Sequence, residues 1–176
     1  MSDATPTPAA PAIVDAPEQV TAVVRVEGYP AAQLPQLFDG VFTRLFPALG
    51  QAGVQPAGPA HALYTRVPGE TVDLEVGIPV DHVLEGTVDL GSLQLETGEE
   101  IPLVARTSSL PGGRIATAAH LGGYDGLGQA WQTFMEALAT GGTPPGTPFW
   151  EVYVTEPSPD MDPATLRTDL FTALQG

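Results

Sequence analysis

Apolar side chains take every second position along residues 20–26, as Val20, Ala22, Val24 and Val26. This period of two predicts a β-strand. Over residues 31–49 the spacing changes to i, i+3, i+4 and i+7, which predicts an amphipathic helix with Leu34, Leu37, Phe38, Val41, Phe42, Leu45, Phe46 and Leu49 on its apolar side. The segments "PAHALYTRV" and "TVDLEVGIPV" alternate again and predict two strands joined by a turn at Pro68-Gly69.

The second half of the chain repeats this order. "GRIATAAHLGGYD" predicts a strand, and residues 125–140 predict a helix with Asp125 as N-cap and Gly141-Gly142 at its end. "PFWEVYVTEP" predicts the next strand, and "TLRTDLFTAL" fits either a final strand or a short helix. The halves also share words, "EGYPAAQLPQLF" with "GGYDGLGQAWQTF" and "PAHALY" with "PFWEVY". We therefore expect an internal repeat in which residues 20–80 superpose on residues 110–174.

The remaining segments set the domain boundaries. Residues 1–18 are rich in Pro and Ala and offer little to bury, so we expect a disordered tail. Residues 86–107, between the halves, contain alternating runs that predict an extra hairpin. With 176 residues and 43% hydrophobic content, residues 19–176 are expected to form one α+β domain.

Composition and charge restrict the function. The chain has no cysteine, which excludes disulfides, thiolate metal sites and a cysteine nucleophile. A formal net charge of −15, with six arginines and no lysine, disfavours nucleic acid and favours cationic or neutral small molecules, although it is also explained by solubility alone. The sequence shows neither a long apolar run nor a signal peptide, so we expect a cytoplasmic protein without a membrane segment.

The other reactive residue types form no known motif. His61, His82 and His120 lack the spacing of a metal site, and "PGGR" at residues 111–114 is a turn rather than a phosphate loop. Ser108 and Ser109 lack a nucleophile elbow. We therefore expect no metal, no cofactor and no serine hydrolase chemistry.

One carboxylate stands out. Alternation in "PFWEVYVTEP" places Glu151 on one strand face with Phe149 and Tyr153, and places Trp150 on the other face, where we expect it to pack under the helices. An acid on such a strand is expected to form an ion pair with an internal arginine, to be exposed to solvent at a sheet edge, or to bind a cationic ligand. Glu75 shares a strand face with Asp73 and is interpreted first as solvated. The helix aromatics at positions 38, 42, 46, 131 and 134 are expected in the core.

The segments "VDLEVGIPV", "LPGGRIATAAHLGGYDGL" and "FWEVYVTEP" resemble the signature blocks of the GyrI-like family, the small-molecule effector-binding domains also fused to AraC-type and MerR-type regulators. The resemblance spans residues 20–174. It implies two strand–helix–strand–strand units that form a curved antiparallel sheet backed by two helices, with a ligand groove between the units. It also implies that Glu151 lies at the bottom of that groove beside Tyr153. Candidate ligand-binding residues are Glu151, Tyr153, Phe149, Tyr64, Trp150 and Glu75. Tyr64 is the repeat-related counterpart of Tyr153, whereas Ala62 occupies the slot of Glu151, so we expect an asymmetric pocket.

The resulting expectation is a free-standing bacterial domain that binds hydrophobic, cationic small molecules, as in multidrug recognition, for sensing or sequestration and without a DNA-binding module. An alternative implied by the resemblance is a hydrolase that opens the cyclopropane ring of DNA-alkylating natural products, with Glu151 as general base. A third class is an adaptor that binds a protein partner.

Overall fold

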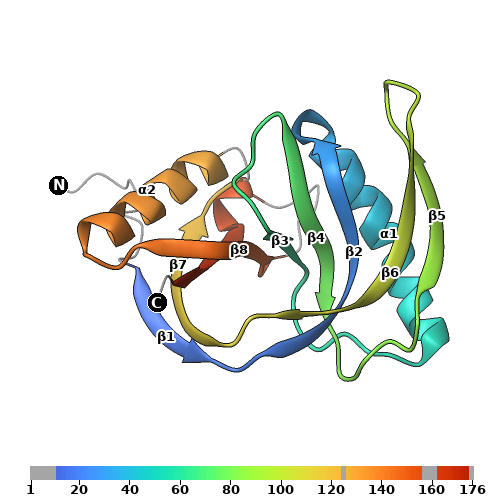
Figure 1. Cartoon of the computed structure of the whole chain (residues 1–176), viewed down its shortest axis with the longest axis horizontal. Helices are drawn as coiled ribbons and strands as arrows, with labels where there is room; N and C mark the ends of the chain where they lie inside the picture. The colour runs from blue at the N-terminus through green and yellow to red at the C-terminus, as the bar shows by residue number, and fades with distance from the viewer. Residues whose placement is uncertain (1–10, 124–125, 156–161, 175–176) are drawn as a thin grey trace. The chain divides into compact units, whose positions relative to one another are not determined.

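The alternating segments form β-strands in the computed structural model, which describes residues 11–123, 126–155 and 162–174. The chain divides into two compact units, residues 17–112 and residues 113–176 together with the segment before residue 17 (Figure 1). The described part of each unit combines an α-helix with an antiparallel sheet, so the fold is α+β, as the sequence predicts. A single domain over residues 19–176 stays a prediction.

The unit of residues 17–112 is built on β2 (Gln19–Pro30) and β4 (Thr71–Pro79), which pair antiparallel. β3 (His61–Tyr64) pairs with β4, β6 (Glu100–Leu110) pairs with β2, and β5 (Val88–Gln94) pairs with β6. The sheet order is therefore β3-β4-β2-β6-β5. β5 and β6 form the hairpin predicted between the two halves, so that prediction is confirmed.

A short 3-10 helix, η1 (Ala31–Gln33), leads into α1 (Leu34–Ala52), which runs along one face of this sheet (Figure 1). Its buried residues are Leu37, Gly40, Val41, Leu45 and Leu49. The prediction that all the α1 aromatics belong to the core is wrong: Phe38 and Phe42 are only partly buried, and Phe46 is 43% exposed. The three rings lie four residues apart, on the flank of the helix beside its buried side.

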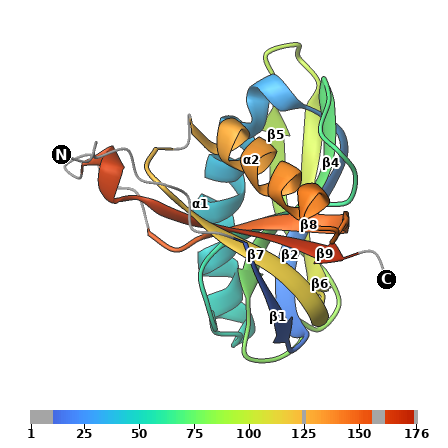
Figure 2. The ribbon, with the colours of Figure 1, turned by 90° about the vertical axis from the view of Figure 1, so that its left-hand side faces the viewer.

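The other unit contains β1 (Ala12–Ala16), β7 (Gly113–Leu121), α2 (Leu127–Thr140), β8 (Pro145–Tyr153), a 3-10 helix η3 (Pro163–Thr165) and β9 (Arg167–Leu174). Its sheet order is β1-β7-β9-β8. Residues 167–174 thus adopt the strand rather than the helix that the sequence also permits. α2 lies beside β8 (Figure 2), and its Phe134 and Leu138 pack on Ala116 and Leu170. The N-cap expected at Asp125 lies outside the described residues.

β1 corrects the expected disordered tail of residues 1–18. Ala12–Ala16 pair with β7 through the backbone, while Ile13 and Val14 stay substantially exposed. An edge strand of this kind is held by main-chain hydrogen bonds rather than by a buried apolar face, so the hydrophobic pattern did not reveal it. Residues 1–10 lie outside the described part of the chain.

The same order of elements recurs in both units, as β2-α1-β3-β4 and as β7-α2-β8-β9. In each unit the last of these strands lies between the other two, giving β2-β4-β3 and β7-β9-β8. This shared topology agrees with the repeat expected from the sequence. The superposition of residues 20–80 on residues 110–174 stays a prediction.

Candidate functional site

The candidate site lies within one unit, on the sheet face that α2 covers. Alternation along β8 directs Phe149, Glu151 and Tyr153 to this face. The strand register places Leu170 opposite Glu151 and Thr168 opposite Tyr153 on β9. The next strand, β7, adds His120 opposite Thr168. Paired residues in an antiparallel sheet share a face, so these six side chains lie on the same side of the sheet, close to one another.

Glu151 is held by two neutral donors. The indole Nε1 of Trp131, on α2, donates to Glu151 Oε1 at 2.7 Å, and the hydroxyl of Tyr153 donates to Oε2 at 2.8 Å. The carboxylate belongs to a residue that is only 7% exposed. Among the residues that the structure describes, the arginine ion pairs are Arg25–Glu27, Arg66–Asp73 and Arg167–Asp169. An internal arginine is therefore not the partner of Glu151 in this structure.

Burial dominates the electrostatics of this carboxyl group. Desolvation raises the pKa of Glu151 above its ordinary value, and the hydrogen bonds from Trp131 and Tyr153, together with the charge of His120, oppose this rise without cancelling it. His120 itself lies with Nε2 at 2.9 Å from the carbonyl oxygen of Gly123. The site can thus exchange a proton or receive a positive charge at Glu151.

Aromatic rings form the apolar wall beside the carboxylate. Trp131 meets Phe149 edge to face, with ring centroids 5.2 Å apart, and also lies 5.7 Å from Phe134. Rings in this arrangement bury a large apolar area and offer faces on which a cation or another ring can rest.

Three residues of this site were not predicted from the sequence: Trp131, His120 and Thr168. Trp131 was expected in the core because it lies on the apolar stripe of its helix, but its indole N–H reaches a strand 20 residues away. His120 and Thr168 become neighbours only through the pairing of β7 with β9. Alternation within each of these strands could have shown their faces, but the sequence did not provide the register.

Trp150 corrects a further expectation. It stacks on Phe171 with centroids 5.5 Å apart and planes 7° from parallel. These two residues are register partners on β8 and β9, on the sheet face opposite Glu151. The prediction that Trp150 packs under the helices is wrong, because α2 covers the face that carries Phe149 and Glu151.

The last two predicted residues, Tyr64 and Glu75, belong to the other compact unit. Tyr64 ends β3 and is buried. Glu75 is partly buried on β4, where its carboxylate accepts a hydrogen bond of 2.6 Å from the hydroxyl of Ser108. The structure therefore groups Phe149, Glu151 and Tyr153 within one unit, and it shows Glu75 in a polar contact of its own rather than simply solvated.

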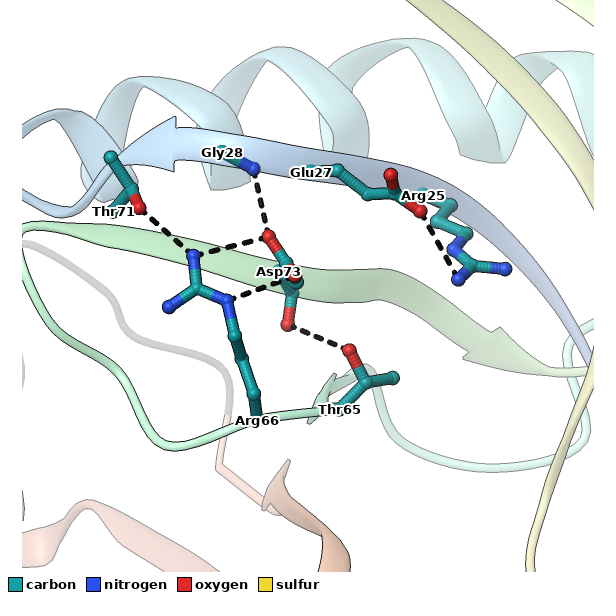
Figure 3. A network of polar contacts seen from close by, with 7 residues as sticks. All are labelled: Arg25, Glu27, Gly28, Thr65, Arg66, Thr71 and Asp73. Atoms are coloured by element: carbon teal, nitrogen blue, oxygen red, sulfur yellow. Dashed lines mark hydrogen bonds and ion pairs between the residues drawn. The ribbon is translucent and has the colours of Figure 1, made fainter.

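Asp73, on the same strand face as Glu75, is the centre of a polar network (Figure 3). Arg66 contacts both of its carboxylate oxygens, with Nε 2.9 Å from Oδ2, and the backbone N–H of Gly28 donates to Oδ1 at 2.8 Å. These contacts, chiefly the Arg66 hydrogen bond, lower the pKa of Asp73. Because its charge is matched within the chain, this network serves the fold and does not call for a ligand.

Within the described residues, no group of three or more His, Asp or Glu side chains is arranged to hold a metal ion. No helix in the same residues is both long enough and apolar enough to cross a membrane. His61 is buried, and desolvation lowers its pKa to about 4.

The profile of the GyrI-like small molecule binding domain matches residues 9–175 of the chain. No sequence among curated proteins matches it. In fold, the chain is similar to the crystal structure of the EcmrR C-terminal domain, with a TM-score of 0.70, 16% identity, and coverage of 94% of this chain and 96% of that domain. It matches EcmrR in a cryo-EM complex with DNA at a TM-score of 0.71 and 17% identity, covering 94% of this chain and 57% of that longer chain.

Two further structures share the fold. SAV2435 bound to tetraphenylphosphonium has a TM-score of 0.59 and 11% identity, with 94% of each chain covered. A hydrolase from Listeria innocua has a TM-score of 0.52 and 11% identity, covering 94% of this chain and 91% of the hydrolase. At such low identity, these similarities show a common fold alone.

Proposed function

Because this chain belongs to the family of GyrI-like small molecule binding domains, we propose that it binds hydrophobic, positively charged small molecules at Glu151. The observation that supports this proposal is a buried carboxylate among aromatic rings, bonded to two neutral donors and to no arginine of the described residues. A desolvated negative charge is costly unless it meets a counter-charge. A lipophilic cation supplies one, and its apolar part can contact Phe149 and Trp131.

A ligand can reach the Glu151 carboxylate only by competing with the side chains that already bond to it. Trp131, which is only partly buried, and Tyr153 occupy one oxygen each. A ligand therefore competes with at least one of these two hydrogen bonds. A positively charged group competes better than a neutral one, because it also gains the Coulomb attraction to the buried carboxylate.

The structural relatives are consistent with this proposal. SAV2435 is seen with tetraphenylphosphonium, a lipophilic cation, and EcmrR combines a C-terminal domain of this fold with DNA binding. For this chain we propose sensing or sequestration of such compounds, and sensing would require a protein or domain that reads out the bound state.

The test compares naphthylmethyl-trimethylammonium with neopentylnaphthalene, which replaces the charged nitrogen by carbon at nearly the same shape. Binding is measured by fluorescence titration of Trp150→Phe, which leaves Trp131 as the reporter because the chain has two tryptophans. We expect the cation to bind more tightly, and Glu151→Gln in that background to weaken only the cation, by on the order of 2–4 kcal/mol. Equal affinity for both compounds, or equal weakening of both by Glu151→Gln, would contradict a cation site.

A second candidate function is hydrolysis of strained rings, which the raised pKa of Glu151 favours because a general base works best with a pKa near the working pH. The Listeria innocua hydrolase shares the fold. Incubating a cyclopropane-bearing alkylating compound with catalytic amounts of the protein separates the two functions. The binding proposal expects the compound to be recovered intact, whereas multiple turnovers that Glu151→Gln abolishes would establish the hydrolase.

A further inference from the structure

Thr168 carries a polar atom that the fold leaves without a partner. It lies on β9 between Tyr153 of β8 and His120 of β7, on the face that α2 covers. Its side chain is fully buried, and its Oγ1 has no hydrogen-bond partner in the described part of the chain. Leaving a buried hydroxyl unpaired is unfavourable, and such groups are few in native structures.

Thr172 shows that the same strand can satisfy a hydroxyl at an equivalent position. It lies four residues further along β9, so it faces the same side of the sheet, and it is also fully buried. Its Oγ1 donates to the carbonyl oxygen of Gly146 at 3.0 Å. Burial of a threonine on this face therefore does not by itself leave the hydroxyl unpaired, and Thr168 needs a separate explanation.

The position of Thr168 relative to Glu151 provides that explanation. Leu170 lies directly opposite Glu151, so Thr168 is the diagonal neighbour of Glu151. Diagonal neighbours on adjacent strands are typically roughly 7–8 Å apart. At this separation, a ligand group that displaces Trp131 from Oε1 would lie between the two polar side chains. Within the described residues each carboxylate oxygen accepts a single hydrogen bond and keeps a free lone pair, and the threonine hydroxyl can also accept. A group inserted there must donate a hydrogen to Glu151, and a group with two or more hydrogens can donate to Thr168 as well.

Resting on the cation site proposed above, we propose that the ligand is a protonated amine whose N–H groups reach both Glu151 and the Thr168 hydroxyl. Thr168 is then the residue that makes the site favour amines with two or more N–H groups over ammonium ions with one or none. An ammonium ion with a single N–H satisfies Glu151 but leaves Thr168 unpaired.

The experiment compares naphthylmethylammonium, which carries three N–H groups, with naphthylmethyl-dimethylammonium, whose single N–H can reach Glu151 or Thr168 but not both. We expect the Trp150→Phe reporter protein to bind the first roughly tenfold more tightly, as for one hydrogen bond to a charged group. Adding Thr168→Val removes the hydroxyl at nearly constant shape, and the ratio of the two affinities should fall to near one. Thr172→Val is the matched control and should preserve the tenfold ratio. An unchanged ratio in Thr168→Val, or no preference in the reporter protein, overturns the proposal.

Stability of the ligand-free protein provides an independent readout. Thr168→Val removes an unpaired hydroxyl, so its denaturation midpoint should equal or exceed that of the wild type. Thr172→Val removes the hydrogen bond that the Gly146 carbonyl oxygen accepts, so it should lower the midpoint. A drop in the midpoint of Thr168→Val similar to that of Thr172→Val would show that the hydroxyl is already satisfied in the free protein, which contradicts the proposal.

The neutral neopentylnaphthalene distinguishes failure of the cation site from failure of the role of Thr168. If it binds as well as the trimethylammonium compound, the cation site itself fails; if it binds less well but Thr168→Val leaves the amine ratio unchanged, only the role of Thr168 fails.

Discussion

Glu151 receives opposing influences from its surroundings, since burial favours its neutral form while Trp131 and Tyr153 favour its charged form. Burial is the larger effect. The alternation of "PFWEVYVTEP" was sufficient to place Phe149, Glu151 and Tyr153 on one face, because the two-residue period is a local property of the strand. It could not show that Trp131 reaches the carboxylate or that Trp150 faces away from α2, because both depend on which face the helix covers.

The stability of Glu151→Gln should depend on pH. In the variant the amide oxygen can accept from Trp131 and the amide nitrogen can donate to Tyr153, so both contacts survive without a charge. In the wild type the pKa of Glu151 is higher in the folded state than the ordinary 4.5, so its contribution to stability is complete below pH 4.5 and is lost as the pH rises through the folded value. Denaturant melts should show the variant gaining on the wild type as the pH rises from 4.5, and parallel curves would contradict this.

His61 should have the opposite dependence. Burial lowers its pKa from 6.5 to about 4, so its neutral form stabilises the fold above pH 6.5 and that stability is lost as the pH falls to about 4. The loss corresponds to on the order of 3 kcal/mol in the free energy of unfolding. His61→Gln should remove this loss between pH 6.5 and 4. His82→Gln, at a histidine that is 55% exposed, is the control for the histidine-to-glutamine change itself. If the wild type and His61→Gln lose stability equally, His61 does not titrate as described.

At the scale of elements, hydrophobic period predicted α1, α2, the hairpin of β5 and β6, and the central strands, because each buries one regular side. The hydrophobic pattern did not predict β1, because main-chain pairing rather than side-chain burial holds this strand. The exposed flank of α1 was not predicted for a related reason: its apolar stripe is wider than the side that the sheet covers, so Phe46 counts as apolar in the pattern yet remains exposed. Period shows which residues could be buried, and only the packing partner determines which of them are.

Gly77 makes a testable contribution to the pairing of β2 with β4. It lies opposite Val23, and a Cβ at this position would overlap the Ala22 carbonyl oxygen and lie 2.7 Å from Val23 Cα. Because these are backbone atoms, the two strands would have to separate. Gly77→Ala should therefore destabilise the protein by about 1–3 kcal/mol or more, measured by denaturant melts.

Gly69→Ala is the matched control for this pairing, because nothing lies within 4 Å of its added Cβ. It should change the midpoint little. Equal stability of Gly77→Ala and the wild type would mean that the close approach of β2 and β4 is not a constraint on the fold.

At the scale of the whole molecule, the chain shares the fold of its structural relatives at 10–17% sequence identity. So few identical residues cannot account for the common fold. What persists is the order of elements, and this order recurs within the chain as β2-α1-β3-β4 and β7-α2-β8-β9. Two features of the sequence indicated this order: the hydrophobic periodicity of the segments, and the similar short segments in the two halves. The groove between the units, with Tyr64 lining it, stays a prediction from the family resemblance, because it depends on contacts between segments far apart in sequence.

The net charge of −15 belongs to the molecule rather than to any residue, and it should act on a cationic ligand separately from Glu151. Charges on the surface attract a cation over a range set by the Debye length, which falls from about 30 Å at 0.01 M salt to about 8 Å at 0.15 M. Affinity for naphthylmethyl-trimethylammonium should therefore fall roughly severalfold over this range, while that for neopentylnaphthalene should not fall. Because buried charges are screened much less than exposed ones, Glu151→Gln should lower cation affinity at every salt concentration and leave the salt dependence nearly intact. Titrations of both proteins at matched salt concentrations give this slope directly. A salt dependence that disappears in Glu151→Gln would assign the whole electrostatic attraction to the buried carboxylate and leave the acidic surface without a role in binding.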